Sequence, residues 1–154
     1  MHEAAFDLSK TYVHLGLGST AVALPDFSWS RESILRYMRD FAQDRDEGRL
    51  VGVVPIKRTW THWECHAGGD EVVLLLSGRC DIVQEIGAGY RTIPMLPGQA
   101  VINPVGVWHT SDVHEPGETL FIAAGRLTRY RDRVPGEPPT GEHLKATPDH
   151  PPQP

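Results

Sequence analysis

Four residues with metal-binding side chains constrain the fold of this chain more than any other feature: Glu64, His66, Glu71 and His109. Three of them lie in one short segment, and the fourth follows far downstream. Neutral imidazole nitrogen and carboxylate oxygen are ligands of Zn, Fe, Mn and Ni in proteins. Because residues two apart in an extended strand point to the same side, His62, Glu64 and His66 should project from one face. The pattern therefore predicts separate strands that meet around one divalent metal site.

The segments that contain these residues resemble the two sequence motifs of the cupin family. The first family motif, G-x5-H-x-H-x3-4-E-x6-G, is similar to Glu64-x-His66-x4-Glu71-x6-Gly78. The second, G-x5-P-x-G-x2-H-x3-N, is similar to Gly98-x5-Pro104-x-Gly106-x2-His109, and this match is nearly complete. The resemblance extends over residues 51–124, which is about half of the chain.

The sequence departs from the family pattern at three positions. Glu64 stands where the family usually has its first histidine. Gly52 lies too far from Glu64 to be the leading glycine of the first motif. Val113 replaces the terminal asparagine. This last change makes the predicted pocket more apolar and favours a hydrophobic or aromatic small molecule as substrate.

The resemblance implies an all-β fold, a cupin-type double-stranded β-helix or jelly-roll barrel, with a metal-centred pocket. It implies one divalent metal ion, Fe, Mn, Zn or Ni, and the ligands would be Glu64, His66, Glu71 and His109. We expect residues 50–130 to form the barrel and residues 1–49 to pack on it as strands and a helix. Residues 131–154 should form a mobile tail, or one ordered only by lying across a partner subunit, because they hold more than half of the thirteen prolines and few large apolar side chains.

Several elements are predicted from local patterns. A helix is expected from Ser30 to Arg45, with Ser28 or Ser30 as N-cap and an apolar stripe that covers the outside of the barrel. His14 has no partner at a meaningful spacing and is predicted to lie on the surface. Ser77-Gly78 is predicted to be a turn, and the strand at 119–124 is the last one expected.

Composition excludes some function classes. The formal net charge is −5 and basic residues do not cluster, so nucleic acid is not an expected partner. No segment approaches the apolar length of a membrane span, and the first residues lack the pattern of a signal peptide. We therefore expect a cytoplasmic protein. Neither of the two cysteines has a CxxC neighbour, and Cys65 should face away from the site.

Glu64 is the residue that decides the chemistry, and two roles are open. As a ligand, it completes a set of two histidines and two carboxylates. As a free carboxyl group in an apolar barrel, it would have a raised pKa and could be a general base or acid. Glu71 is either a ligand or a carboxylate at the rim that binds an arginine or solvent.

The neighbouring residues have alternative roles as well. His62 could donate to the ligands, shuttle a proton or replace a ligand, or it could be a structural histidine bonded to backbone. Arg58 could bind an anionic group of the substrate. Trp60 and Tyr90 are substrate-binding candidates, and core or rim packing is the other interpretation of both.

Two classes of function remain. The first is a metalloenzyme that carries out oxygenation, isomerisation or elimination on a small molecule, at the metal or with Glu64 as base. The second is a non-catalytic cupin that binds or senses a small ligand. A homodimer is expected in either case, because an open sheet edge and an apolar outer face need cover.

Overall fold

The computed structural model describes residues 5–134. Within this range the chain forms an antiparallel β-structure with one α-helix, α1 (Arg31–Asp40), and two short 3-10 helices at Leu17–Ser19 and Ala42–Asp44. The strands are β1 (Tyr12–Gly16), β2 (Thr20–Leu24), β3 (Arg49–Ile56), β4 (His62–His66), β5 (Glu71–Ile86), β6 (Gly89–Met95), β7 (Ala100–Asn103), β8 (His109–Ala123) and β9 (Thr128–Asp132). The expected all-β class is confirmed.

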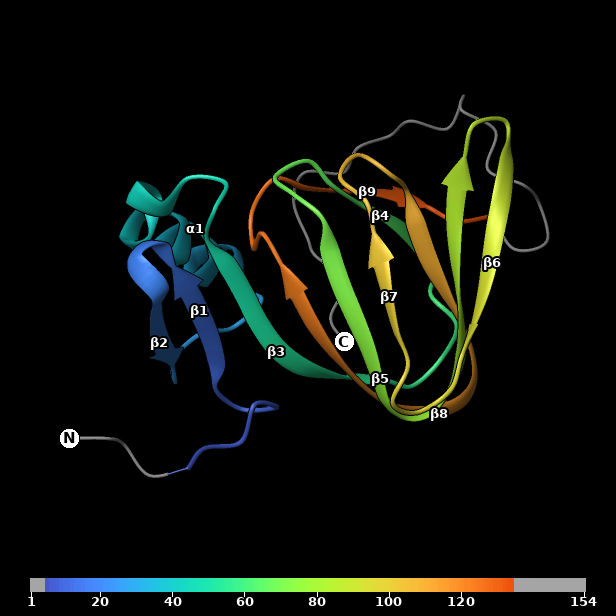
Figure 1. Ribbon diagram of the computed structural model, residues 1–154, viewed down its shortest axis with the longest axis horizontal. Helices are drawn as coiled ribbons and strands as arrows, with labels where there is room; N and C mark the ends of the chain where they lie inside the picture. The colour runs from blue at the N-terminus through green and yellow to red at the C-terminus, as the bar shows by residue number, and fades with distance from the viewer. Residues whose placement is uncertain (1–4, 135–154) are drawn as a thin grey trace.

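Two long, bent strands, β5 and β8, hold the barrel together (Figure 1). They pair antiparallel from Val72 opposite Ile122 to Gln84 opposite His109. The first part of β5 also pairs with β7, and its last part pairs with β6. On its other edge, β8 pairs with β3 near its end and with β4 at its start. Each long strand therefore belongs to both walls of the barrel, and the interior lies between the walls.

The bend of β5 lies at Ser77 and Gly78. The register with β8 shifts on both sides of Ser77, and Gly78 has a φ of 82°. Glycine adopts this φ without steric cost, and a bulge of this kind bends and twists a strand. A Cβ atom at Gly117 would collide with the Ser77 carbonyl, so the two strands approach closely at the bend. The predicted turn at Ser77-Gly78 is wrong, because the chain continues as one bulged strand.

The N-terminal strands extend the wall formed by β3. In the sheet, β2 is an edge strand that pairs with β1, and β1 pairs with β3. The side chain of Ser30 caps α1 by accepting a hydrogen bond from the Ser33 amide, which confirms the predicted N-cap. The helix ends at Asp40, before the expected end at Arg45.

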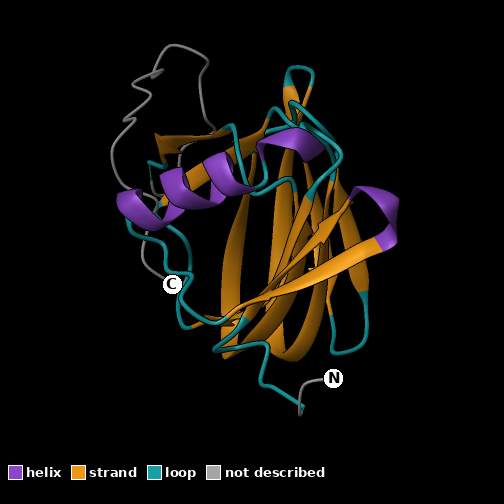
Figure 2. Ribbon diagram, turned by 90° about the vertical axis from the view of Figure 1, so that its left-hand side faces the viewer, coloured by secondary structure: helices purple, strands orange, loops and turns teal. Residues whose placement is uncertain are grey.

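The helix lies across the strands at one end of the barrel (Figure 2). Tyr37 packs with Leu50 of β3 and Phe121 of β8 in one apolar cluster. On the same helix, Ile34 and Met38 line the internal cavity. The expectation that α1 covers the outside of the barrel is therefore wrong: its apolar stripe covers the cavity.

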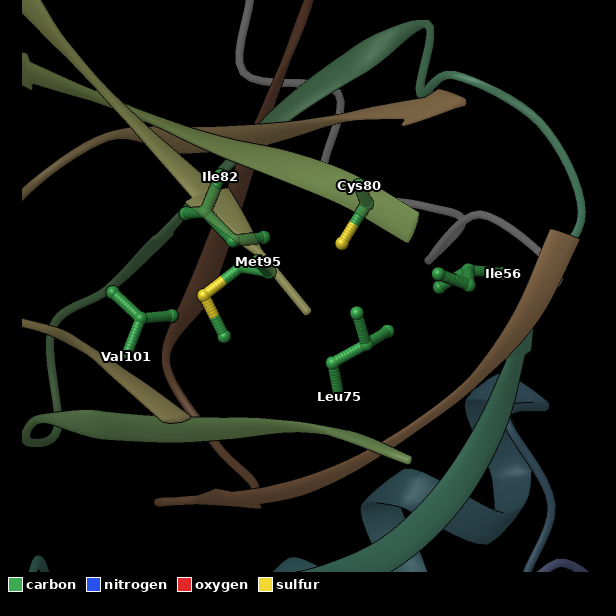
Figure 3. Packing of buried hydrophobic residues seen from close by; sticks show 6 residues of the cluster. All are labelled: Ile56, Leu75, Cys80, Ile82, Met95 and Val101. Atoms are coloured by element: carbon green, nitrogen blue, oxygen red, sulfur yellow. The ribbon is translucent and has the colours of Figure 1, made fainter. Parts of the chain in front are cut away.

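A second apolar cluster fills the opposite end of the interior. Its buried members come from β3, β5, β6 and β7, and their side chains point toward one another (Figure 3): Ile56, Leu75, Cys80, Ile82, Met95 and Val101. This core closes one end of the barrel, and the polar site described below lies beyond it.

His14 is buried, which contradicts the prediction that it lies on the surface. Its Nε2 atom lies 2.7 Å from Asp44 Oδ2, and its Nδ1 atom lies 2.9 Å from the Tyr37 hydroxyl. Asp44 belongs to the short 3-10 helix after α1, so this network joins the helical segment to β1. Its partners are remote in sequence, and local spacing does not reveal them.

The last strand, β9, pairs with β4 along its whole length. The predicted start of the tail at residue 131 falls inside this strand, which ends at Asp132. Arg131 lies between two tryptophans, with its guanidinium 4.5 Å from the ring centre of Trp108 and 5.2 Å from that of Trp63. It also forms an ion pair with Glu85. The rest of the predicted tail, from residue 135, lies outside the described residues.

Among residues 5–134, no helix has the length and apolar character needed to cross a membrane.

Candidate metal centre

Three strands bring the predicted ligands together. On β4, Glu64 and His66 share one face of the strand, as their spacing predicts. His109 is the first residue of β8 and pairs directly with Glu64, and Glu71 is the first residue of β5. The two sequence motifs therefore meet at one place on the inner wall of the barrel.

Glu64, His66 and His109 form a donor group that could hold a metal ion. Each offers one ligand atom, and these atoms lie within 4.8 Å of one another. The Nε2 atoms of both histidines are buried and make no hydrogen bond of normal geometry, although Glu71 oxygens lie 3.3 and 3.1 Å from them. A buried polar atom without a hydrogen bond is rare in proteins and needs an explanation. A divalent ion between the two imidazoles supplies one.

A hydrogen bond at Nδ1 orients the ring of each histidine. His109 Nδ1 lies 3.2 Å from the Val107 carbonyl oxygen. Because a carbonyl only accepts, Nδ1 must donate the hydrogen, and Nε2 then carries the lone pair that a metal needs. His66 Nδ1 lies 3.0 Å from the Thr128 hydroxyl, which fixes that ring in a similar way.

Glu71 lies between the two imidazoles. Its Oε1 atom is 3.3 Å from His66 Nε2, and its Oε2 atom is 3.1 Å from His109 Nε2. Burial by itself raises the pKa of Glu71, but the contacts with His109 and His66 outweigh it and bring the pKa below its ordinary value. Burial by itself lowers the pKa of His66, and the Glu71 and Glu64 carboxylates raise it above its ordinary value. The alternative of a rim carboxylate does not fit, because Glu71 is buried.

Glu64 lines the cavity together with the other residues of the cluster. One of its oxygens, Oε1, is 3.1 Å from His62 Nε2, and the other, Oε2, is 4.0 Å from His66 Nε2. The ring of Trp60 stacks on His62 with a centroid distance of 4.8 Å and an angle of 14° between the planes. His62 therefore contacts Glu64 directly and is held in place by an aromatic neighbour.

Tyr130 is a site residue that the sequence analysis missed. It pairs with Glu64 across β4 and β9 and lines the same cavity. Burial raises the pKa of Tyr130 above its ordinary value, and the nearby Glu64 and Glu71 carboxylates add to this effect. Its strand lies close to the predicted tail, and the alternation of Thr128 and Tyr130 with arginines is the signal that could have indicated a strand.

The site opens into an internal cavity of about 820 Å³. Its apolar walls come from α1 and from the inner faces of β3, β5 and β8, and they include Trp29, Ile34, Met38, Leu50, Val73 and Phe121. Arg58 and Trp60 line it as well, so two of the three predicted substrate-binding residues lie at the cavity. A space of this size accommodates a small organic molecule beside the donor group.

Tyr90 is not among the residues that line this cavity. It pairs with Glu85, whose neighbour Gln84 is buried beside the site, so alternation along β5 and β6 turns Tyr90 outward. There it contacts Trp63, with 6.1 Å between the ring centres. The structure therefore does not bring Tyr90 to this cavity, and its role in binding a substrate stays a prediction. Cys65 also faces away from the cluster, and Arg129 donates a hydrogen bond to its sulfur.

Both motif segments thus meet on the inner wall of one bent antiparallel barrel, with the motif histidines and carboxylates in contact. The chain folds as a bent antiparallel β-barrel, and its motif segments resemble those of cupins. The helix α1 and the β1–β2 hairpin lie at one end of this barrel.

Comparisons with known proteins found similarity to solved structures over about half of the chain. No protein-family model matches the sequence. No curated protein matches it either. Among solved structures, a cupin-2 domain containing protein from Shewanella frigidimarina is 23% identical, with a TM-score of 0.42, over 48% of this chain and 68% of that chain.

Two solved enzymes are similar over a comparable part of the chain. A hydroquinone 1,2-dioxygenase from a Sphingomonas species, with 4-hydroxybenzoate bound, is 17% identical, with a TM-score of 0.43, over 49% of this chain and 58% of that chain. A variant of oxalate decarboxylase from Bacillus subtilis is 16% identical, with a TM-score of 0.47, over 56% of this chain and 24% of that chain. The activities in these names are those of the named proteins.

Proposed function

We propose that the protein is a small metalloenzyme that acts on an apolar or aromatic organic molecule in the cavity. The observation that supports it is the pair of buried Nε2 atoms of His66 and His109, which make no hydrogen bond of normal geometry and face the Glu71 and Glu64 carboxylates. Burying polar atoms without partners costs free energy, and binding of one divalent ion would remove that cost. His66 and His109 would hold the ion together with Glu71, whose oxygens lie 3.3 and 3.1 Å from their Nε2 atoms, and Glu64 of the donor group is a further candidate ligand. Fe, Mn, Zn and Ni are the candidates.

When bound, such an ion supplies Lewis acidity or, in the case of iron, redox chemistry. The residues of the chain bind and orient the substrate. The apolar walls exclude water, and the Arg58 guanidinium binds an anionic group of the molecule at the mouth of the cavity. Trp60, held by its stacking on His62, offers an aromatic face. This arrangement suits oxygenation, isomerisation or elimination.

Glu64 is proposed either as a further ligand or as a general base. As a ligand, it would join His66, whose Nε2 atom lies 4.0 Å from Glu64 Oε2. As a base, it would take a proton from a carbon atom of the substrate, while His62 contacts its other oxygen and keeps the carboxylate oriented. The Glu64→Gln variant separates the roles, because it loses metal if Glu64 is a ligand and keeps metal if Glu64 is a base.

A non-catalytic cupin that binds or senses a small ligand is the alternative. The size and apolar lining of the cavity favour it, because they suit retention of a molecule as well as its conversion. Incubation with a panel of aromatic acids, followed by mass spectrometry of the recovered compounds, distinguishes the two functions. A bound and chemically unchanged compound supports the sensor.

We also propose a cytoplasmic location and a homodimer. The edge strand β2 and its neighbour β1 carry exposed apolar side chains, Val22 and Leu15. A second copy that pairs or packs along this edge would cover them. Light scattering during gel filtration should give twice the mass of one chain, and a Val22→Lys variant should give the mass of one chain. Cell fractionation tests the location.

The metal content of the purified protein tests the proposed enzyme. Elemental analysis should find nearly one equivalent of a transition metal per chain in the wild type and a loss of it in His66→Ala and His109→Ala. His114→Ala is the matched control, because His114 pairs with Asp81 and is partly exposed. Absence of metal from the wild type after reconstitution would contradict the proposal.

A further inference from the structure

Two buried amides hold the carboxylate of Glu71. Asn103 Nδ2 donates to Glu71 Oε2 at 2.9 Å. Gln84 Nε2 donates at 2.8 Å to Asn103 Oδ1 and at 2.8 Å to the Ile102 carbonyl oxygen. The exposed fractions of Asn103 and Gln84 are 1% and 2%. Neither amide was predicted from the sequence as part of the site.

The direction of this hydrogen-bond chain is fixed by its two ends. The Ile102 carbonyl only accepts, so the NH₂ group of Gln84 faces it and Asn103 Oδ1 together. Asn103 must then turn its own NH₂ group toward Glu71, which as a carboxylate only accepts. Each side-chain amide therefore has one orientation that satisfies all of its partners. A flip of either amide group by 180° would break these hydrogen bonds.

This chain of hydrogen bonds links β5 to β7, two strands that contain residues of the two motif segments. Asn103 pairs with Glu71 across β7 and β5, and Gln84 pairs with His109 across β5 and β8. The amides thus fix Glu71 relative to the strand that carries His109. Glu71 Oε1, on the side of His66, has no contact with either amide.

We propose that Asn103 is the positioning residue for Glu71 in the metal centre, and that Gln84 sets the orientation of Asn103. This inference rests on the proposed metalloenzyme. By donating to Oε2, Asn103 keeps the carboxylate from rotating and presents Oε1 to the ion. Hydrogen-bond partners of metal ligands typically change metal affinity by about 10–100-fold when they are removed.

The test is Zn²⁺ affinity of the metal-free protein, measured by titration calorimetry, together with the absorption spectrum of the Co²⁺ form. Asn103→Ala removes the donor, and Asn103→Asp replaces it by an acceptor of the same size. Both should weaken Zn²⁺ binding by about 10–100-fold, and Asn103→Asp should do so more strongly. Gln84→Glu should have a smaller effect in the same direction, with a shifted Co²⁺ spectrum in every case.

Val101→Ala is the matched control, because Val101 lies two residues before Asn103 on the same strand and belongs to the apolar core. It should reduce stability and leave Zn²⁺ affinity unchanged. Wild-type affinity and an unchanged Co²⁺ spectrum in both Asn103 variants would overturn the role of Asn103 and leave the metalloenzyme intact. A wild type that binds neither Zn²⁺ nor Co²⁺ would overturn both proposals.

Discussion

Replacing Glu71 by glutamine should lower the pKa of His66 in the metal-free protein. The Glu71 carboxylate lies 3.3 Å from His66 Nε2 and is a cause of the raised pKa of that imidazole. Glutamine has nearly the same shape and keeps an oxygen for Asn103, so the variant removes the charge and preserves the packing. Burial by itself lowers the pKa of His66, and in the variant only the Glu64 carboxylate still raises it.

The magnitude follows from Coulomb's law. Two unit charges 3.3 Å apart attract by about 5 kcal/mol at an effective dielectric constant of about 20. The Glu64 carboxylate, 4.0 Å from the same nitrogen, remains in the variant and still stabilises the protonated form of His66. We therefore expect the titration midpoint of His66 to fall in the variant, because the larger of the two attractions that raise its pKa is lost.

The same pair makes the stability of the metal-free protein depend on pH. A raised pKa of His66 adds stability that is fully present below its ordinary value of 6.5 and is lost as the pH rises through the raised value. A lowered pKa of Glu71 adds stability that is present above its ordinary value of 4.5 and is lost as the pH falls. The wild type should therefore exceed Glu71→Gln in stability most clearly between pH 4.5 and 6.5.

The assay is an NMR titration of the ¹⁵N-labelled imidazoles, with His66 assigned from its own substitution. The control is Glu115→Gln, because Glu115 pairs with Arg79 at an exposed position and does not contact the site. An unchanged His66 midpoint in Glu71→Gln would refute the reasoning, since it would mean that the Glu71 carboxylate does not act on this imidazole.

Three further predictions concern the core, the helix and the cavity. Leu75 is fully buried in the apolar core, so Leu75→Ala should cost about 2–5 kcal/mol in the free energy of unfolding, measured with urea, and leave the metal content unchanged. Burial raises the pKa of Tyr37 to about 12, so its contribution to stability is present below pH 10 and is lost as the pH rises toward 12. Tyr37→Phe should therefore lose less stability than the wild type between pH 10 and 12, in denaturation curves at several pH values. Arg58→Ala should weaken binding of an aromatic carboxylate more than binding of its neutral amide, and calorimetry with both compounds would show equal losses if Arg58 has no such role.

Much of the metal centre could be predicted because its residues follow short-range rules. Alternation along a strand places Glu64 and His66 on one face, and this needs only the assumption of an extended segment. The meeting of His109 with Glu64 is a long-range pairing, and it was available through the resemblance to the cupin motifs. Asn103, which holds Glu71, lies outside the motif positions that were weighed, so its role became visible only through the pairing of β7 with β5.

The errors arise where distant contacts outweigh local signals. A serine followed by glycine is typical of a turn, but the pairing of Ser77 and Gly78 with β8 turns this site into a bulge. His14 seemed isolated because its partner Asp44 is thirty residues away in the chain. The face on which the Tyr90 side chain lies depends on the strand register. A hairpin prediction alone does not give that register, and a slip of one residue exchanges the inner and outer faces.

A crystal structure with bound metal, phased at the absorption edge of that metal, tests the central claim most directly. We expect one anomalous peak about 2.0–2.2 Å from the Nε2 atoms of His66 and His109, with a Glu71 oxygen at a similar distance. A peak elsewhere in a protein of full metal content would contradict the proposed metal centre. So would a site in which both Nε2 atoms hydrogen-bond to protein or water and no peak is present.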